Sequence, residues 1–260
     1  MVADLPAVGA NLQDHPLVAA GFTASKALGF ETMLRLDRLA VHMPRWGLTG
    51  RGPIADAPIS VQAFLRLNAA SGRPDVQFQV SHVSFMSRPW FPGWRLSAGN
   101  QFMAAAMQLR PEGRGSVTLR SADPHDPPCI RLGLLSHETD WQMARDMLRF
   151  IRSYFATAPL PDIISSEIFP GANVQSDAEL DAVVRQTIMV GMHPAGSCAM
   201  GLNPATSVVD AQLKVHGIEG LRTADTSVMP RIIGGNTAAP AVMIGEKLSD
   251  MMKPHSPETV

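Results

Sequence analysis

The chain has 260 residues, of which 45% are hydrophobic and 17% are charged, and its formal net charge is −1. This composition excludes a disordered protein, and the length permits one large domain or two smaller ones. The balance of 22 Lys and Arg against 23 Asp and Glu argues against a nucleic-acid partner, and the longest apolar run, residues 102–107, is far below the roughly 20 residues that span a bilayer.

The first half of the chain is expected to be rich in strands. Residues 1–16 contain proline and glycine too often for a regular element, so they are predicted to form a loop. A helix is predicted over 31–45, ending at Pro44. Four strand-like stretches follow, at residues 59–67, 76–85, 101–109 and 116–120.

Two helices are predicted in the middle of the chain. The first covers 140–155, because its apolar residues recur at steps of three and four. These residues are Trp141, Ala144, Leu148, Ile151 and Phe155. The second helix begins at Ser176, which is followed three residues later by Glu179 in the pattern of a capping box.

The C-terminal part is predicted to contain short strands at 207–210, 213–218 and 221–225. A last helix is expected over 238–252, capped by Asn236 or Thr237, and residues 253–260 are expected to be a frayed tail. Strands and helices do not alternate steadily along the chain. The expected fold class is therefore α+β, with an antiparallel sheet and flanking helices.

Two segments carry the candidate site, GMHPAGSCAMG at 191–201 and TADTSVMPRIIGGNTAAP at 223–240. His193 lies in a glycine- and proline-flanked loop, and Asn236 lies 43 residues later at the start of the last helix. Together they offer one titratable base, one amide and the positive end of a helix. Each residue alone is more readily explained by structure than by function, as a satisfied or surface histidine and as a helix-capping asparagine.

Other sequence motifs are incomplete. Gly113 and Gly115 begin a GxGxxG pattern, but Thr118 stands in place of the third glycine and a strand follows. Gly196 directly precedes Ser197, so there is no GxSxG nucleophile elbow. His193 and Cys198 lack a second pair of zinc ligands, so no metal site is expected.

The two segments and the opening loop resemble motifs of the glucose–methanol–choline (GMC) oxidoreductases, in the choline-dehydrogenase-like branch. HPAGSCAMG is similar to the family's His-Pro-x-Gly-Thr-Cys-x-Met-Gly segment, and residues 207–252 resemble its closing block. DLPAVGANLQDHP and residues 110–130 resemble two further stretches, so that the resemblance spans residues 4–252. The departures are small: Ala7 replaces Gly, Ser197 replaces Thr and Ala239 replaces Asn.

This resemblance implies an FAD-dependent enzyme that oxidises an alcohol to an aldehyde and passes hydride to the flavin N5. The catalytic pair implied is His193, which takes the hydroxyl proton, and Asn236, which orients the alcohol. Residues Thr237 and Ala238 would offer N–H groups to the flavin, and Asp225 would contact the FAD chain. Asn11 would belong to the turn beside the cofactor, although an Asx turn without a ligand explains it equally well.

The resemblance also implies a domain division. Residues 1–20 and 186–252 would belong to the FAD-binding domain, and 21–185 would form the substrate-binding domain. The Rossmann half of the FAD domain, with its GxGxxG fingerprint, is not found in this sequence. We therefore expect a C-terminal fragment that is inactive alone, and the missing N-terminal half is a candidate partner.

Two alternatives to an alcohol dehydrogenase or oxidase stay open. One is a hydroxynitrile lyase of the same fold, and the other is a non-catalytic remnant or accessory subunit of a split flavoenzyme. The expected partners are a small alcohol and an electron acceptor, which is a quinone, a carrier protein or oxygen. With two cysteines outside any CxxC and no basic residue near the N-terminus, a cytoplasmic location is expected.

Overall fold

The computed structural model describes residues 4–26, 30–55, 59–84 and 86–253. The chain divides into two compact units. Unit 1 comprises residues 1–16, 109–141 and 190–260, and unit 2 comprises residues 17–108 and 142–189. Residues 109–141, which the sequence division places in the substrate domain, thus pack in unit 1 together with the two candidate segments.

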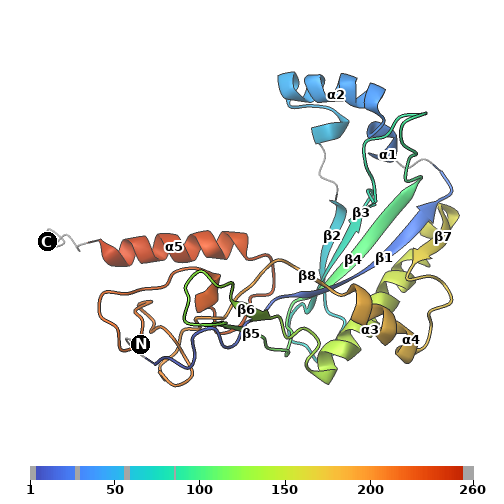
Figure 1. The fold of residues 1–260 in the computed structure, drawn as a ribbon. Coiled ribbons are helices and arrows are strands. Elements are labelled where there is room, and N and C mark those ends of the chain that lie inside the picture. The colour runs from blue at the N-terminus through green and yellow to red at the C-terminus, as the bar shows by residue number, and fades with distance from the viewer. Residues whose placement is uncertain (1–3, 27–29, 56–58, 85, 254–260) are drawn as a thin grey trace, which may run out of the picture. The chain divides into compact units, whose positions relative to one another are not determined.

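Unit 2 is built on an antiparallel sheet in the strand order β2-β3-β4-β1-β7, with the short β8 also paired to β1 (Figure 1). The strands are β1 (Pro16–Ala24), β2 (Ile59–Leu65), β3 (Val76–Ser81), β4 (Gln101–Gln108), β7 (Ile164–Phe169) and β8 (Met189–Val190). The expected α+β class with an antiparallel sheet is confirmed. The three strands predicted at 59–67, 76–85 and 101–109 are confirmed as β2, β3 and β4.

Strand β1 was not predicted, although it lies inside the sheet between β4 and β7. Seven of its nine residues are buried. Because both faces of this strand are covered, its sequence PLVAAGFTA has no alternation of apolar and polar residues that would reveal a strand.

Helix α3 (Glu138–Phe155) covers one face of the sheet through aromatic contacts. The Phe78 ring lies 5.2 Å from that of Phe150, and the Phe22 ring lies 4.5 Å from that of Phe155. Phe155 belongs to the predicted stripe of apolar residues, and Ala144, Leu148 and Ile151 of the same stripe are buried. Helix α4 (Asp177–Thr187) begins at the predicted capping box, in which Ser176 accepts from the Glu179 amide.

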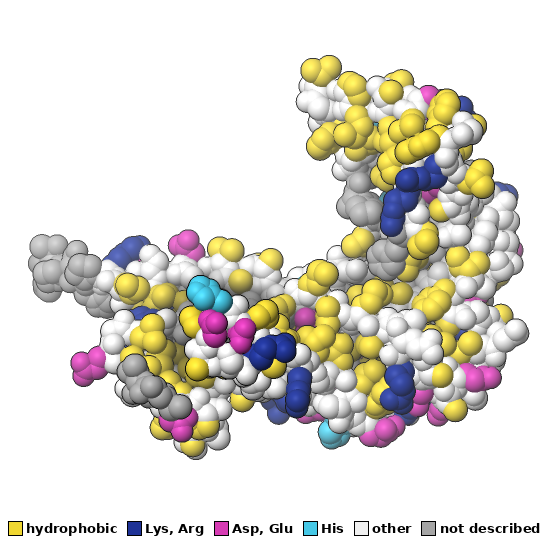
Figure 2. Space-filling model, viewed as in Figure 1, with side chains coloured by type: hydrophobic (Ala, Val, Ile, Leu, Met, Phe, Trp, Pro, Cys, Tyr) yellow, Lys and Arg dark blue, Asp and Glu magenta, His cyan; other side chains and the backbone are white. Residues whose placement is uncertain are grey.

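The helix predicted over 31–45 is two helices, and the predicted end at Pro44 is wrong. Helix α1 (Phe30–Met33) is followed by α2 (Leu36–Thr49), with Pro44 inside α2. Gly50 ends α2 with a φ of 64°, a left-handed conformation that glycine adopts without a steric penalty. Figure 2 shows hydrophobic side chains gathered over α2, where Val41 is 65% and Leu48 is 87% exposed.

Unit 1 contains few regular elements. They are β5 (Ser116–Thr118), β6 (Cys129–Arg131), the 3-10 turn η3 (Thr226–Val228) and α5 (Ala238–Met252). The predicted strand at 116–120 is confirmed as β5 and the last helix as α5. Two further 3-10 turns, η1 (Pro53–Ala55) and η2 (Leu160–Asp162), lie in unit 2. The tail predicted for 253–260 lies outside the described residues apart from Lys253.

The short strands predicted between 207 and 225 are wrong. The described structure has only isolated bridges there, such as Val209 with Val215 and Lys214 with Arg222. Turns at Gly217 and Gly220, both with positive φ, leave segments too short to extend a ladder.

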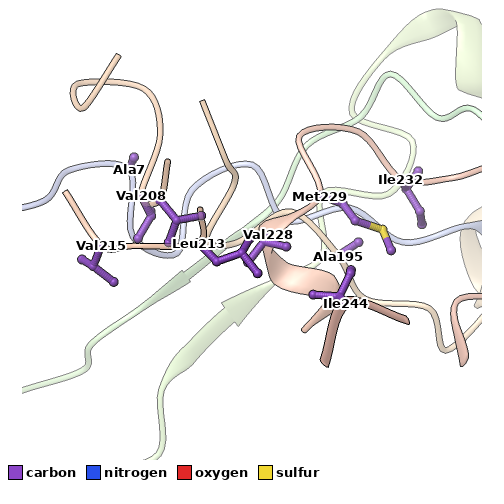
Figure 3. Close-up of a cluster of buried hydrophobic side chains, with 10 residues drawn as sticks. Ala7, Ala195, Val208, Leu213, Val215, Val228, Met229, Ile232 and Ile244 are labelled. Carbon is purple, nitrogen blue, oxygen red and sulfur yellow. The ribbon is translucent and has the colours of Figure 1, made fainter. Parts of the chain in front are cut away.

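Loops and α5 supply the core of unit 1. Figure 3 shows this cluster of buried side chains, which comes from sequence positions as distant as Ala7 and Ile244. A core of this kind fixes the loops that carry the candidate site. Among the described residues, no helix combines the length and the apolar character needed to cross a bilayer.

Candidate active site

The loop that carries His193 lies beside the opening loop of the chain, both in unit 1. The Gln13 and Ala195 backbones exchange two hydrogen bonds of 2.9 Å. Asp14, which is 4% exposed, accepts from the backbone amides of His15 at 2.7 Å and His193 at 3.0 Å through one carboxylate oxygen. These contacts bring the two histidines together.

The two imidazoles form a chain of polar contacts with Asn236. His15 Nε2 lies 2.9 Å from the Ile233 carbonyl oxygen, and the two Nδ1 atoms of His15 and His193 lie 3.0 Å apart. At the other end, the Asn236 amide donates to His193 Nε2 over 3.2 Å. The structure thus joins the two residues predicted as a catalytic pair, and adds His15 behind them.

These partners assign the protons. A carbonyl oxygen only accepts, so His15 Nε2 carries a hydrogen. Burial, opposed by the bond to Ile233, lowers the pKa of His15 from 6.5 to about 4, so this ring is neutral at pH 7 and its Nδ1 has a lone pair. The proton between the two Nδ1 atoms therefore belongs to His193.

His193 consequently presents an unprotonated Nε2 to Asn236. Burial lowers the pKa of His193, although the nearby Asp14 carboxylate raises it, so the ring is neutral at pH 7. A neutral imidazole whose Nε2 carries a lone pair can accept a proton from a hydroxyl group that takes the place of the Asn236 N–H. The arrangement is that of a general base with a fixed tautomer.

The buried His15 should make the protein sensitive to acid. The unfolded chain binds a proton at His15 below about pH 6.5, whereas the folded chain does so only near pH 4. Between these values unfolding takes up a proton, so stability falls as the pH falls. We expect the free energy of unfolding to drop by about 2 kcal/mol more between pH 7 and pH 5 in the wild type than in His15→Asn, measured by urea denaturation.

The exposed-histidine variant His137→Asn is the control for this prediction, and it should keep the wild-type pH dependence. The wild type, His15→Asn and His137→Asn contain the same carboxylates. Their contribution to the change in unfolding free energy therefore cancels when the proteins are compared. If the free energy of unfolding changed equally with pH in the wild type and in His15→Asn, His15 would not be held neutral.

Asn11 ties the His193 loop to the neighbouring segments. Its Nδ2 donates to the carbonyl oxygens of Gly196 at 3.3 Å and Pro230 at 3.2 Å, and its Oδ1 accepts from Arg114 Nε at 3.0 Å. Gln13 makes parallel contacts, donating to the Pro230 carbonyl and accepting from the Ile232 amide. Both side chains therefore hold the loops of the site in place.

Gly196 is required where the His193 loop meets Asn11. Its φ is +87°, and an added Cβ would lie 2.5 Å from the Asn11 carbonyl oxygen and 2.7 Å from Gln13 Nε2. We expect Gly196→Ala to lose about 1–2 kcal/mol from the left-handed backbone alone, and more from these contacts. Thermal denaturation measures the loss. Gly217→Ala is the control, since Gly217 has a φ of +70° but open space around it; equal losses in both variants would refute the close approach.

Helix α5 begins at Ala238, two residues after Asn236, and within the described part of the chain its first N–H groups have no hydrogen-bond partner. Thr237, at the N-cap position, makes no capping bond through its side chain, and the first turn of α5 contains no acidic residue. The amides of Ala238 and Ala239 are thus available as donors at the positive end of the helix. Arg110 adds a cation, because a Cβ on Gly234 would lie 2.6 Å from its Nη2.

Asp225 has a structural contact of its own. Its side chain accepts from the Ser227 amide at 2.7 Å and caps the turn η3. This turn borders the His193 loop, since Thr226 Oγ1 donates to the Pro194 carbonyl at 2.8 Å. Among the described residues, no group of three His, Cys, Asp or Glu side chains is arranged to hold a metal ion.

Sequence reasoning missed His15 and Asp14. Their partners lie about 180 positions along the chain, so no local pattern shows the contact. The available signal was the Asp-His pair inside DLPAVGANLQDHP, a stretch already singled out for its resemblance. Arg110 was also missed, although it opens the stretch 110–130.

Comparisons with known proteins identify the family of the chain. A family model described as GMC oxidoreductase matches residues 111–245. The chain is 37% identical to an oxygen-dependent choline dehydrogenase of Brucella anthropi over 258 residues, which are 99% of this chain and 46% of that protein. It is 36% identical to oxygen-dependent choline dehydrogenase 1 of Chromohalobacter salexigens, covering 99% of this chain and 45% of the relative.

Among solved structures, a formate oxidase of Aspergillus oryzae superposes with a TM-score of 0.85 at 26% identity. The match covers 96% of this chain and 48% of that one. The chain spans about half the length of the curated relatives it matches. The family match extends over more than half of the chain and contains both His193 and Asn236. The chain therefore belongs to the GMC oxidoreductase family.

Proposed function

We propose that the protein oxidises the CH–OH group of a small alcohol, with FAD as its cofactor and His193 as the general base. The observation that carries this proposal is the unprotonated Nε2 of His193, 3.2 Å from the Asn236 amide and adjacent to the uncapped start of α5. Relatives named choline dehydrogenase and a structural neighbour named formate oxidase support an oxidation.

The residues around α5 fit a flavin in the chemistry of their donors. The amides of Ala238 and Ala239 are donors at the positive end of α5, and the Arg110 guanidinium lies beside Gly234, four residues before that helix. Such donors suit the pyrimidine edge of a flavin, which becomes anionic on reduction. We propose Thr237 and Ala238 as cofactor contacts, with Asp225 on the FAD chain and Asn11 as the residue that holds the surrounding loops.

In the proposed mechanism, bound FAD supplies an acceptor for the hydride. His193 Nε2 accepts the hydroxyl proton of the alcohol, while its Nδ1–H stays bonded to His15. When the alcohol binds, an N–H of the Asn236 amide would turn from Nε2 to the alkoxide oxygen, which it stabilises without titrating. We propose that the flavin-domain segments 1–20 and 186–252 lie mostly in unit 1, and that unit 2 provides most of the substrate domain.

The test supplies the chain with an N-terminal FAD-binding half and with FAD. The loss of flavin absorbance then follows its anaerobic reduction by a panel of primary alcohols that includes choline. Bleaching by an alcohol supports the proposal. Retention of oxidised flavin with every alcohol contradicts it, and cleavage of a hydroxynitrile under the same conditions would identify a lyase instead. Failure to take up FAD even with the N-terminal half supplied would favour a non-catalytic subunit. A cytoplasmic location is proposed from the free thiols of Cys129 and Cys198.

A further inference from the structure

Helix α2 of unit 2 carries a stripe of apolar residues, yet none of its 14 residues, all of which are described, is buried. Leu36, Leu39, Met43 and Trp46 recur at steps of three and four, which places them on one side of the helix. Met43 is 48% and Trp46 is 44% exposed, and Figure 2 shows hydrophobic side chains gathered there. Because a helix of this length gains most of its stability from packing its apolar side, this side is expected to have a partner.

The loop of residues 86–97 lies against the start of α2 and presents further exposed apolar side chains. The Trp90 carbonyl oxygen accepts from the Leu36 amide at 2.9 Å, so the loop is fixed to the first residue of the helix. Trp94 in this loop is 61% exposed, and Leu96 is 90% exposed. We call α2 and this loop together the arginine–aromatic face of unit 2.

The arginine–aromatic face is strongly positive. Residues 35–51 and 86–97 contain six arginines and one acidic residue, in a chain whose net charge is −1. The acidic residue is Asp37, which pairs with Arg35 at 2.9 Å. The other five arginines are all exposed, and they are Arg38, Arg45, Arg51, Arg88 and Arg95. Exposed apolar side chains and an excess of cations thus occur on the same two segments.

These two properties together favour a bilayer surface that contains anionic lipids. A basic amphipathic helix with tryptophan on its apolar side is typical of helices that lie in the membrane interface. Guanidinium groups bind phosphate through paired hydrogen bonds, and tryptophan rings prefer the level of the lipid headgroups. Leu48 and Leu96, which are 87% and 90% exposed, project from the protein, and projecting apolar side chains insert readily into a deformable bilayer.

A second copy of the chain suits this face less well than a bilayer does. Two arginine–aromatic faces in contact would place the arginines of one copy opposite those of the other, and like charges facing each other oppose association. An anionic bilayer compensates the positive charge and also takes up the apolar side chains.

We propose that the arginine–aromatic face docks the protein on the surface of an anionic lipid bilayer. The arginines bind lipid phosphates, while Trp46, Trp94 and Leu96 enter the headgroup region. Helix α2 lies on the bilayer and does not cross it, because its 14 residues fall short of the roughly 20 that span a membrane. The docking is independent of the proposed oxidation, since neither the His193 loop nor α5 takes part.

The test mixes the chain at pH 7 with vesicles of phosphatidylcholine and phosphatidylglycerol in equal parts and measures bound protein by co-sedimentation. Vesicles of phosphatidylcholine alone are the comparison. We expect binding to the anionic vesicles to be at least about tenfold tighter, and to weaken when the salt concentration is raised to about 1 M, which screens the arginines. Absence of binding to the anionic vesicles, or equal binding to both kinds, would overturn the proposal.

Two double variants locate the docking. Arg38→Gln with Arg45→Gln should weaken binding to the anionic vesicles by about thirtyfold, the expected effect of losing two basic residues near such a surface. Trp94→Ser with Leu96→Ser removes apolar side chains and should weaken binding by about tenfold or more. All four positions are exposed, so the fold should be kept, as circular dichroism would verify. Wild-type binding by either folded variant would overturn the proposal.

Arg120→Gln with Arg131→Gln is the matched control, because it removes the same charge from exposed positions of unit 1. This variant should bind as the wild type does, and an equal loss of binding would overturn the assignment to α2 and the loop 86–97. Vesicle binding should also persist when an N-terminal FAD-binding half is supplied. Its loss in that complex would show that the other half covers the arginine–aromatic face, and would overturn the proposal.

Discussion

Replacing His193 with glutamine is expected to slow flavin reduction by an alcohol about 10²–10⁴-fold, because glutamine keeps a polar side chain in the loop but cannot accept the hydroxyl proton. Stopped-flow reduction of the FAD-loaded protein, with the N-terminal FAD-binding half supplied, measures the rate. In the wild type, the rate should fall only when the pH drops below 6.5, since burial lowers the pKa of His193. In His193→Gln, the rate should be low at every pH, and its fall below pH 6.5 should disappear.

His216→Gln is the matched control for this prediction. His216 also lies in a loop of unit 1, where its Nε2 contacts the Gly201 carbonyl oxygen at 3.1 Å and Ser207 Oγ at 3.2 Å, and it has no contact with His193 or Asn236. The flavin in His216→Gln should be reduced at the wild-type rate. If His193→Gln also kept that rate, proton transfer to His193 would be excluded.

Replacing His15 with leucine is expected to slow the same reaction about tenfold to a hundredfold, the usual effect of losing a partner that orients a reactive histidine. His193 would lose the acceptor for its Nδ1–H and could move its proton to Nε2, where it blocks the base. His15 is thus a positioning residue. The measurement is the reduction rate as a function of pH at saturating alcohol.

His15→Asn separates orientation from packing. The asparagine Oδ1 can take the place of the His15 Nδ1 acceptor, although both variants lose the bond to the Ile233 carbonyl. The rate in His15→Asn should therefore recover most of the loss seen in His15→Leu, with an unchanged KM. Equal rates in the two variants would show that His15 acts only by filling space.

The elements that sequence predicted well are those with local signals. Helix α3 follows from a stripe of apolar residues, and α4 follows from Ser176 and Glu179. Strand β1 was missed because it is covered on both faces, and α2 was ended too early because Gly50, and not Pro44, terminates it. Contacts between loops stabilise unit 1, and such contacts produce no periodic pattern of apolar residues in the sequence.

The candidate site shows the same division. The pairing of His193 with Asn236 was predicted from a family resemblance, and the structure brings the two side chains together. The tautomer of His193 could not be predicted, because it depends on His15, on the Ile233 carbonyl and on the depth at which His15 is buried. Those are long-range contacts, and only the folded chain assembles them.

The protonation state of His193 tests the central claim most directly. Two-bond proton–nitrogen NMR spectra of the protein labelled with ¹⁵N at histidine report which ring nitrogens carry hydrogen at pH 7. We predict that His193 is neutral with its proton on Nδ1 and a bare Nε2, and that His15 is neutral with its proton on Nε2. A His193 ring protonated on Nε2, or charged at pH 7, would contradict the account.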